Sequence, residues 1–402
     1  MNREVIVIGG GASGMAAAIS AAEQGAQVTL LEKKEQTGKK ILVSGNGRCN
    51  FSSTALSARR YHCSDEAFLD RFLTRFPAER LLSRFRDLGL YAAERNGGYY
   101  PSSFQASSVN TVLQRALKTL DVSVRSRVNV LSVEKEEDGF IVRSESEAFH
   151  AGKVILACGS PAGVSDPKPF TAYDILKRFG LTAAPCFPAL ARLIGNNGYE
   201  SLWDGVRIPG IVSFYGRTYE GEIQLTKDGI SGIPVFQLAH DVNLALLDGK
   251  RPCVMISFLK EPSREELAAY LKEAKAATLT NALSFRDYIS ALLPKKLAMA
   301  LFSGSSYEQL PLSALDETHT EEILQRIYAF SYPVQKSAPM KEAQVSAGGL
   351  LLSAVNDDFE VRSVPGLFVT GELLDVDGET GGFNLHFAFA SGFTAGEKAG
   401  RP

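Results

Sequence analysis

The sequence predicts an α/β fold in which the two ends of the chain build a parallel sheet and the middle forms a separate insertion. Residues 5–8 are a continuous β-branched run, typical of a strand buried on both faces of a parallel sheet. A second such run ends at Gly159, and a third, residues 364–372, lies near the C-terminus. Between the second and third runs, short strand-like runs give way to helical patterns, which indicates an inserted segment.

The composition is that of an ordinary globular protein. Of the 402 residues, 45% are hydrophobic and 22% are charged, which excludes a disordered chain or an all-helical rod. The length suits two to three domains, because single cores stop growing at about 250–300 residues. The formal net charge of −2 gives no support to nucleic-acid binding, which usually needs a basic surface, so we expect no nucleic acid as a partner.

The cysteines and histidines predict neither a disulfide framework nor a metal site. The five cysteines are far apart and form no CxxC pair, and no pair among the five histidines has metal-ligand spacing. This cysteine usage is typical of a reducing compartment, so we expect a cytoplasmic protein. Residues 5–22 carry no charge, but consecutive glycines interrupt the apolar run, so we predict no membrane span.

The first 32 residues have the pattern of a strand–turn–helix–strand unit. The glycine motif of residues 9–14 follows the first strand, and an Ala-rich helix over residues 15–24 leads to a second strand that ends at Glu32. In a dinucleotide-binding unit, Gly9 would permit the tight turn, Gly11 would let a pyrophosphate approach the backbone, and Gly14 would let helix and sheet pack closely.

Glu32 lies where a carboxylate can accept hydrogen bonds from ribose hydroxyls. The same charge would repel a 2′-phosphate, which argues against NADP at this site. The helix start presents free N–H groups and partial positive charge to phosphates. This motif predicts dinucleotide binding but does not separate FAD from NAD.

A second helix start lies far from the first in the sequence. Gly381 and Gly382 precede an apolar, Ala-rich segment that continues to Ala399 and is expected to be a helix. The first helix start suits a pyrophosphate. The second suits the electron-rich edge of a flavin, which gains negative charge on reduction, so the pair of helix starts favours FAD.

With these motifs, the chain resembles the two-dinucleotide-fold flavoproteins and, more narrowly, the BaiN/YhiN-like FAD-dependent oxidoreductases, some of which are named aminoacetone oxidases. The resemblance rests on residues 9–14, 38–50 and 371–384 and spans almost the whole chain. It implies a Rossmann-like FAD-binding domain with an inserted β-barrel-like domain that carries a helical subdomain and closes over the flavin.

The expected boundaries follow the changes of pattern. The FAD-binding domain takes residues 1–187 and 345–402, the inserted β-rich substrate domain takes 188–262, a helical insert takes 263–308, and the inserted domain returns over 309–344. Within the insertion we expect helices over residues 234–247, 263–277, 284–302 and 317–330. Ser263 with Glu266 and Thr318 with Glu321 form plausible capping boxes.

The resemblance also implies roles for single residues. Glu32 would hold the adenosine ribose, Val128 would contact adenine, and Glu372 would reach the ribityl–phosphate region. The flavin or its linker would be lined by residues of the 38–50 motif, and the isoalloxazine would be capped at the second helix start. The expected cofactor-binding residues are Gly9, Gly11, Ala12, Ser13, Gly14, Glu32, Lys33, Lys40, Ser44, Gly45, Asn46, Arg48, Cys49, Asn50, Val128, Ala157, Gly159, Gly371, Glu372, Gly382, Phe383 and Asn384.

Two residues near the expected flavin could take part in chemistry or be structural. Cys49 could be a redox thiol, but flavin disulfide reductases need a partner cysteine nearby, so we interpret Cys49 as a small buried thiol. His386 could face the flavin or the substrate, and a structural role is favoured. Asn46 stands where the family often has glycine. No catalytic side chain is assigned, because the flavin N5 carries the chemistry.

The sequence therefore predicts an FAD-dependent oxidoreductase that transfers hydride between a small organic substrate and non-covalently bound FAD. Oxygen or transiently bound NAD(P)H could be the second substrate, since a single GxGxxG gives no support to a dedicated nicotinamide site. Two alternatives stay open: an NAD-dependent dehydrogenase that uses the N-terminal site, and a non-catalytic FAD-bound sensor or binding protein.

Overall fold

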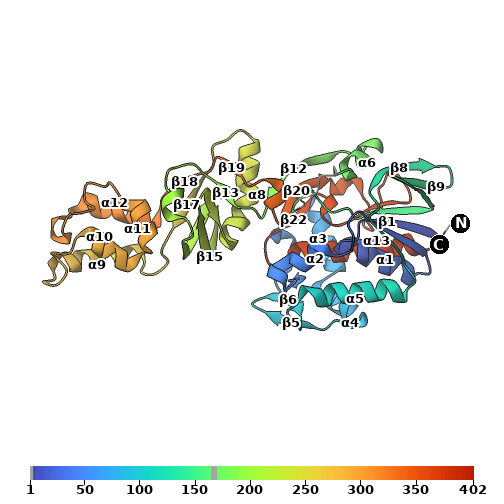
Figure 1. The fold of residues 1–402 in the computed structure, drawn as a ribbon, viewed down its shortest axis with the longest axis horizontal. Helices are drawn as coiled ribbons and strands as arrows, with labels where there is room; N and C mark the ends of the chain where they lie inside the picture. The colour runs from blue at the N-terminus through green and yellow to red at the C-terminus, as the bar shows by residue number, and fades with distance from the viewer. Residues whose placement is uncertain (1–2, 164–169) are drawn as a thin grey trace. The chain divides into compact units, whose positions relative to one another are not determined.

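The computed structural model describes residues 3–163 and 170–402, and these form two compact units (Figure 1). The Rossmann-like unit comprises Met1–Phe187 and Val345–Pro402, and the inserted unit comprises Pro188–Gln344. The first holds a parallel sheet and the second an antiparallel sheet, so the predicted fold class is confirmed.

The parallel sheet joins both ends of the chain. Its strand order is β21 (Leu367–Val369), β11 (Lys153–Leu156), β1 (Glu4–Ile8), β2 (Gln27–Glu32) and β7 (Ser123–Ser126). Ile8 at the end of the central strand lies opposite Leu31 on one side and Leu156 on the other. Because β21 comes from the last 36 residues, the sheet is complete only when the C-terminal segment has joined the N-terminal one.

The other elements of this unit surround that sheet or extend from it. Its further helices are α2 (Lys39–Val43), α3 (Glu66–Arg75), α4 (Ala78–Asp87), α5 (Ala106–Thr119) and α6 (Ala172–Arg178). Its further strands are β3 (Ser52–Ser53), β4 (Tyr61–Cys63), β5 (Ala92–Arg95), β6 (Gly98–Pro101), β8 (Val130–Glu136), β9 (Gly139–Ser144), β10 (Ala148–Ala151), β20 (Val345–Leu350) and β22 (Val376–Gly378), and β12 (Ala183–Ala189) leads out of the unit.

Two helices of this unit, α1 (Ala12–Glu23) and α13 (Phe383–Gly400), lie against each other (Figure 1). Three glycines of α13 form the contact. A Cβ at Gly392 would lie 2.2 Å from the Ser13 carbonyl oxygen, and one at Gly396 would lie 2.2 Å from the Ala17 carbonyl oxygen. Gly400 meets α1 one turn further along. The two backbones therefore touch with no side chain between them.

The pairing also sets the direction and offset of the two helices. Gly392 faces Ser13 and Gly396 faces Ala17, so residue numbers rise together and the helices are parallel. The α13 helix begins nine residues before its first contact, whereas α1 begins one residue before. At 1.5 Å per residue, the N-terminus of α13 projects about 12 Å beyond that of α1, in the same direction.

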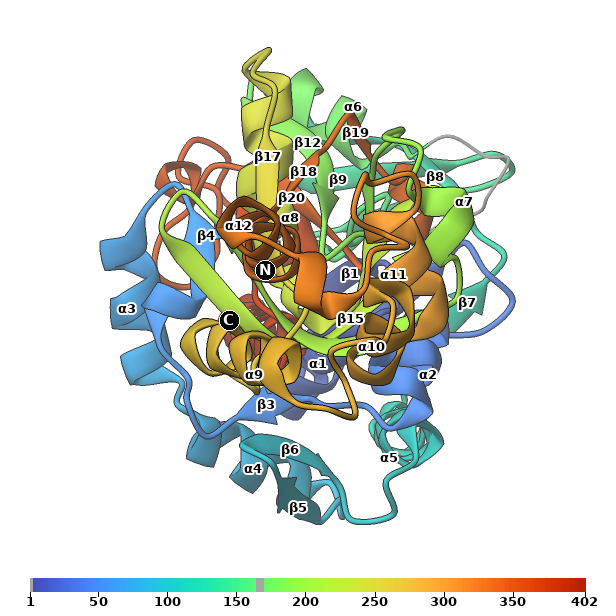
Figure 2. The ribbon, with the colours of Figure 1, turned by 90° about the vertical axis from the view of Figure 1, so that its left-hand side faces the viewer.

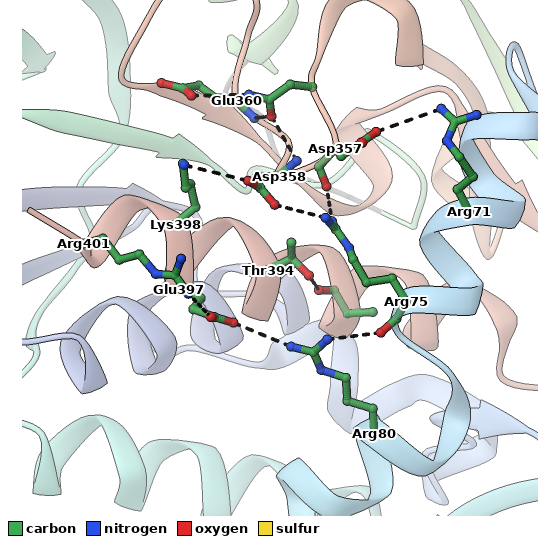
Figure 3. Close-up of polar contacts among 12 residues, drawn as sticks. Arg71, Arg75, Arg80, Asp357, Asp358, Glu360, Thr394, Glu397, Lys398 and Arg401 are labelled. Atoms are coloured by element: carbon green, nitrogen blue, oxygen red, sulfur yellow. Dashed lines mark hydrogen bonds and ion pairs between the residues drawn. The ribbon is translucent and has the colours of Figure 1, made fainter.

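Ion pairs at the surface join α13 to α4 and to the loop before β21, and they join that loop to α3 (Figure 3). Arg75 donates to the Asp358 carboxylate (3.2 Å), and Arg80 lies 3.6 Å from Glu397 and donates to the Arg75 carbonyl oxygen (3.1 Å). These side chains are substantially exposed, so each pair adds little stability. The aromatic core beneath, which includes the fully buried Phe76, contributes far more.

The inserted unit has an antiparallel sheet and a group of helices. The strand order is β18 (Phe330–Pro333), β17 (Cys253–Ser257), β14 (Arg207–Phe214), β15 (Arg217–Thr226), β16 (Gly229–Ser231), β13 (Leu193–Ile194) and β19 (Lys336–Ser337). Its helices are α7 (Glu200–Trp203), α8 (Ile233–Leu247), α9 (Arg264–Ala276), α10 (Phe285–Leu292), α11 (Lys295–Phe302) and α12 (Glu317–Tyr328). Figures 1 and 2 show α9 to α12 gathered into one group.

Two local predictions for this unit are wrong. The helix expected over residues 284–302 is split into α10 and α11, because Pro294 lacks an N–H and Leu293 before it is extended. The capping box at the start of α12 is formed by Asp316 and His319. The expected pair, Thr318 and Glu321, does not form it.

The capping box of Ser263 and Glu266 at the start of α9 is confirmed. The Ser263 hydroxyl accepts from the Glu266 N–H (3.2 Å), and the Glu266 carboxylate accepts from the Ser263 N–H (2.8 Å). Within residues 3–163 and 170–402, none of the helices combines the length and apolar character needed to span a bilayer.

Gly396→Ala tests the contact between α1 and α13. The added methyl group collides with backbone, so we expect the free energy of unfolding to fall by about 1–3 kcal/mol, although alanine favours helix formation. Lys398→Ala, at an exposed position of the same helix, is the control and should change it by less than about 0.5 kcal/mol. Equal stability of both variants in urea unfolding would contradict the proposed contact.

Candidate functional site

The glycine motif closes the turn from β1 into α1. Gly9 has a φ of +107°, and a Cβ there would lie 2.3 Å from the Ala157 carbonyl oxygen. At Gly14, a Cβ would lie 1.8 Å from the Gly9 carbonyl oxygen. Both glycines are therefore required by the packing of the turn, the helix and β11.

Gly11 differs from the other two glycines. It precedes Ala12 and Ser13 at the start of α1, and its φ of −80° is open to any residue. No atom of the described residues lies within 4 Å of a Cβ built at this position. Gly11 is the N-cap of α1, so this open space adjoins the free N–H groups of a helix start, a cradle that fits a phosphate group.

Glu32 connects the end of β2 to the glycine turn. Its carboxylate accepts hydrogen bonds from the Gly10 N–H and the Lys34 N–H, both at 2.7 Å, and its backbone oxygen accepts from the Val128 N–H at 2.9 Å. Each carboxylate oxygen keeps a second lone pair for a ligand hydroxyl. The carboxylate thus shapes the turn and can also accept from a ribose.

A pocket of about 80 Å³ lies beside Glu32. Gly9, Glu32, Lys33 and Val128 line it, so the structure brings together four of the expected cofactor-binding residues, and two of these, Glu32 and Val128, were expected at the adenosine end. Cys158 also lines the pocket, and its thiol lies 3.5 Å from the Ile8 carbonyl oxygen.

Two expected residues follow β11. Ala157 is almost fully buried, and its N–H donates to the Ile8 carbonyl oxygen (2.9 Å), which continues the sheet. Gly159 has a φ of +68°, and within the described residues a Cβ there would have no neighbour within 4 Å. This end of β11 therefore leaves room next to the glycine turn.

The loop over residues 44–49 has an unusual backbone. Gly45, Asn46, Gly47 and Cys49 all have positive φ, between +54° and +78°. A left-handed conformation costs a non-glycine residue about 1–3 kcal/mol and is typical of ligand-binding segments. Asn46 is a residue type that tolerates this conformation, which explains how it replaces the glycine common in the family. Ser44, at the start of the loop, donates from its hydroxyl to the Ile41 carbonyl oxygen (2.6 Å), and Arg48 lies exposed on the loop.

Asn50 lies between this loop and the start of α13. A Cβ at Gly98 would lie 2.6 Å from its Nδ2, and a Cβ at Gly382 would lie 2.7 Å from its Oδ1. The Oδ1 atom is buried, and no hydrogen-bond donor among the described residues reaches it. Glycines from two distant segments thus make room for an amide oxygen that still needs a donor.

Side chains at the second helix start hold the preceding loop. The Asn384 amide donates to the Gly378 carbonyl oxygen (2.6 Å) and accepts from the Gly378 N–H (2.8 Å). Phe383 is buried, and its carbonyl oxygen accepts from the Tyr61 hydroxyl (2.9 Å). The N-cap of this helix is Gly382, with a φ of +98°. The helix start can therefore present its backbone N–H groups to a ligand.

The Lys40 ammonium lies 2.7 Å from one carboxylate oxygen of Glu372. The Ser346 N–H donates to the other carboxylate oxygen at 2.9 Å. The adjacent Gly371 has a φ of +65°, and a Cβ there would lie 2.7 Å from the Ser13 hydroxyl. Residues from three distant parts of the sequence thus converge beside the start of α1.

Cys49 and His386 are buried. Burial raises the pKa of the Cys49 thiol to about 12, so it stays protonated and unreactive. His386 Nε2 lies 3.0 Å from the Phe76 carbonyl oxygen and Nδ1 lies 2.9 Å from the Ser52 hydroxyl. Nε2 must be the donor to the carbonyl, so the ring links α13 to the loop after α3. Burial lowers the pKa of the ring to about 4, so it is neutral near pH 7.

Sequence reasoning missed the glycine stripe of α13. The four-residue spacing of Gly392, Gly396 and Gly400 is visible in the sequence and signals close helix packing. It also missed Asn50 as an unpaired acceptor, which only the three-dimensional arrangement shows.

Gly11→Val tests the phosphate cradle. The structure offers both space and an ordinary backbone conformation, so the apoprotein should keep its thermal unfolding midpoint. The side chain would fill the cradle, and FAD affinity should fall by at least about a hundredfold, or ~2.8 kcal/mol. FAD titration of the apoprotein measures this, and unchanged affinity would place the phosphates elsewhere.

His386 predicts acid sensitivity. Burial lowers its pKa from 6.5 to about 4, so the unfolded chain binds a proton that the folded chain rejects. This stability is complete above pH 6.5 and is lost as the pH falls towards 4, by about 3 kcal/mol in total. Urea unfolding at pH 7.5 and 4.5 should show a smaller loss for His386→Gln than for the parent. The exposed His150→Gln is the control, and an equal loss in all three would refute the prediction.

The chain matches the family described as HI0933-like protein Rossmann domain over residues 3–398. It is 37% identical to 3-dehydro-bile acid delta(4,6)-reductase of Clostridium scindens, with 99% of each chain covered. It is 26% identical to the ribosomal RNA dihydrouridine synthase of Escherichia coli, covering 98% of this chain and 97% of that protein.

Solved structures share the fold. The 3-ketosteroid-delta4-(5alpha)-dehydrogenase of Rhodococcus jostii is 16% identical, with a TM-score of 0.50 over 99% of this chain and 97% of that chain. The glycine turn with its open cradle, the two parallel helix starts and these matches agree with one another. The chain therefore belongs to the HI0933-like Rossmann-domain family and is an FAD-dependent oxidoreductase.

Proposed function

We propose that this enzyme reduces a carbon–carbon double bond conjugated to a carbonyl group in a small apolar molecule of the steroid class. The observation that carries the proposal is the 37% identity, over 99% of both chains, to a reductase of 3-dehydro-bile acids. That name describes reduction of ring double bonds near a keto group. An identity of this size over the full length supports a related substrate.

The more distant relatives support the same chemistry on a different molecule. Two ribosomal RNA dihydrouridine synthases are 26% and 24% identical, and dihydrouridine arises by reducing a double bond next to a carbonyl. A ribosomal RNA substrate calls for a basic surface, whereas this chain has a net charge of −2. The charge therefore favours the small molecule.

The Rossmann-like unit offers the groups that would hold FAD. The α1 start with Gly11 would bind the pyrophosphate, Glu32 would accept from the adenosine ribose, and Val128 would lie at the adenine. The α13 start, with Gly382 as N-cap, would oppose negative charge on the flavin edge. Asn50 would offer its unpaired oxygen to an N–H of the cofactor.

The remaining expected residues would act at the linker between the two helix starts. Lys40 would place a positive charge there, and Glu372 would hold both Lys40 and the Ser346 backbone in position. The buried Cys49 thiol would pack against the cofactor without redox chemistry. When bound, FAD accepts a hydride equivalent from a donor such as a nicotinamide dinucleotide and delivers one to an electron-poor carbon.

Anaerobic half-reactions test the proposal. The holoenzyme is reduced with NADH or NADPH and then mixed with a 3-oxo-4,6-diene bile acid. We expect the oxidised flavin spectrum to return and the product to gain two hydrogen atoms per double bond. The saturated 3-oxo bile acid is the matched control and should leave the flavin reduced.

A third arm contains unmodified ribosomal RNA. Reoxidation by the RNA and not by the dienone would replace the proposed substrate with a nucleic acid. Reoxidation by oxygen alone would identify an oxidase.

A further inference from the structure

Backbone from distant segments of the chain holds the side-chain amide of Asn50 in place. Asn50 lies just before β3, where the Phe51 N–H donates to the Tyr99 carbonyl oxygen (2.9 Å). A Cβ at Gly98 would lie 2.6 Å from the amide nitrogen, and one at Gly382 would lie 2.7 Å from the amide oxygen. Only glycine at both positions leaves room for the amide, so its location is closely defined.

The loop before Asn50 turns back onto this residue. A Cβ at Gly45 would lie 3.1 Å from the Asn50 backbone nitrogen, and the Cys49 N–H donates to the Ser44 carbonyl oxygen (3.1 Å). Asn46 and Cys49 have positive φ values, a strain that persists only where the surrounding structure imposes it. The strained loop and the two glycines therefore converge on the same amide.

The amide oxygen of Asn50 is an acceptor that still needs a donor. Oδ1 is buried, and no donor among the described residues reaches it. A buried acceptor without a partner destabilises a folded chain, and a ligand that donates to it removes this cost. Asn384 at the same helix start differs, because its amide already bonds twice to Gly378. One asparagine holds the loop, and the other is open to a ligand.

The place of this oxygen selects one N–H group of the flavin. Oδ1 lies beside Gly382, the N-cap of α13, whose free backbone N–H groups suit the N1–O2 edge of the ring. An acceptor next to these donors fits a ring edge on which a donor follows an acceptor. On the isoalloxazine that donor is N3–H, between O2 and O4. The N5–H forms only on reduction and lies beyond O4, on the central ring.

We propose that Asn50 positions the cofactor by accepting a hydrogen bond from the flavin N3–H at Oδ1. The proposal rests on the part of the proposed function that places the flavin edge at the α13 start, and it does not depend on the organic substrate. Because N3–H is present in oxidised and reduced flavin alike, this bond fixes the ring without favouring either redox state. A bond from N5–H would instead stabilise the reduced flavin and raise its midpoint potential.

N3-methyl-FAD, which lacks this donor, tests the proposal. The full-length apoproteins of the parent, Asn50→Ala, Asn50→Asp and Asn384→Ala are titrated with FAD and with N3-methyl-FAD. The two cofactors and the variants form a cycle that isolates the contact between residue 50 and N3. Asn384→Ala is the matched control, since it removes the same chemical group at the same helix start. The midpoint potential of each FAD-loaded protein is also measured.

The parent should bind FAD at least about a hundredfold more tightly than N3-methyl-FAD, because the methyl group removes the donor and collides with Oδ1. In Asn50→Ala, FAD affinity should fall by about ten- to a hundredfold, as expected for a buried hydrogen bond. The preference for FAD should shrink to less than about threefold, and the midpoint potential should stay at the parental value. Asn50→Asp keeps an acceptor and should keep a preference of at least about tenfold. Asn384→Ala should weaken both cofactors equally.

Equal affinity of the parent for both cofactors overturns the inference without any variant. A preference that survives in Asn50→Ala also overturns it, because another residue then makes the contact. Loss of the preference together with a lower midpoint potential in Asn50→Ala overturns it as well and assigns the oxygen to N5–H.

The proposed function fails separately from this inference. A parent that binds FAD with the expected preference but reduces no dienone overturns the proposed substrate and leaves the role of Asn50 standing. A parent that binds no FAD overturns the placement of the flavin and this inference together.

Discussion

The close approach of α13 to α1 is the constraint on which the rest of the structure depends. Glycines on one helix and small residues on the other allow backbone to touch backbone along two turns or more. No flexible side chain intervenes, so the offset of the two N-termini is held as firmly as the backbone itself. The distance between the two helix starts is therefore fixed for any ligand that spans them.

Parallel helices packed side by side also place two positive dipole ends on the same side of the unit. Like ends repel, and the arrangement is tolerated more easily when an anion lies near them. A cofactor with two phosphates and a ring that becomes negative on reduction supplies such charge at both positions. The same packing that fixes the distance therefore also creates the preference for an anionic ligand.

Much of this could be predicted from local patterns. In the first 32 residues, the order of hydrophobic runs, glycines and an acid is typical of a strand–turn–helix–strand unit. The elements β1, α1 and β2 lie where this pattern predicts them. The break at Pro294 was missed because helical periodicity continues across it, although proline at that position argues for an interruption.

Other features depend on pairing between segments far apart in the chain. The Asn384 amide was expected at a flavin, and its bonds to Gly378 follow from how the loop closes on the helix. The unpaired oxygen of Asn50 likewise depends on Gly98 and Gly382, which no local pattern connects.

The late position of β21 and α13 in the chain has a consequence for biosynthesis. A ribosome produces the N-terminal portion first, and this portion has neither its edge strand β21 nor the helix that covers α1. The inserted unit, continuous from Pro188 to Gln344, has all its strands while the tail is still being made. The nascent first half must therefore wait, with the side of α1 that packs on α13 uncovered, until β21 and α13 have been made. During that interval the uncovered apolar surface is the part of the nascent chain that a chaperone would have to shield from aggregation.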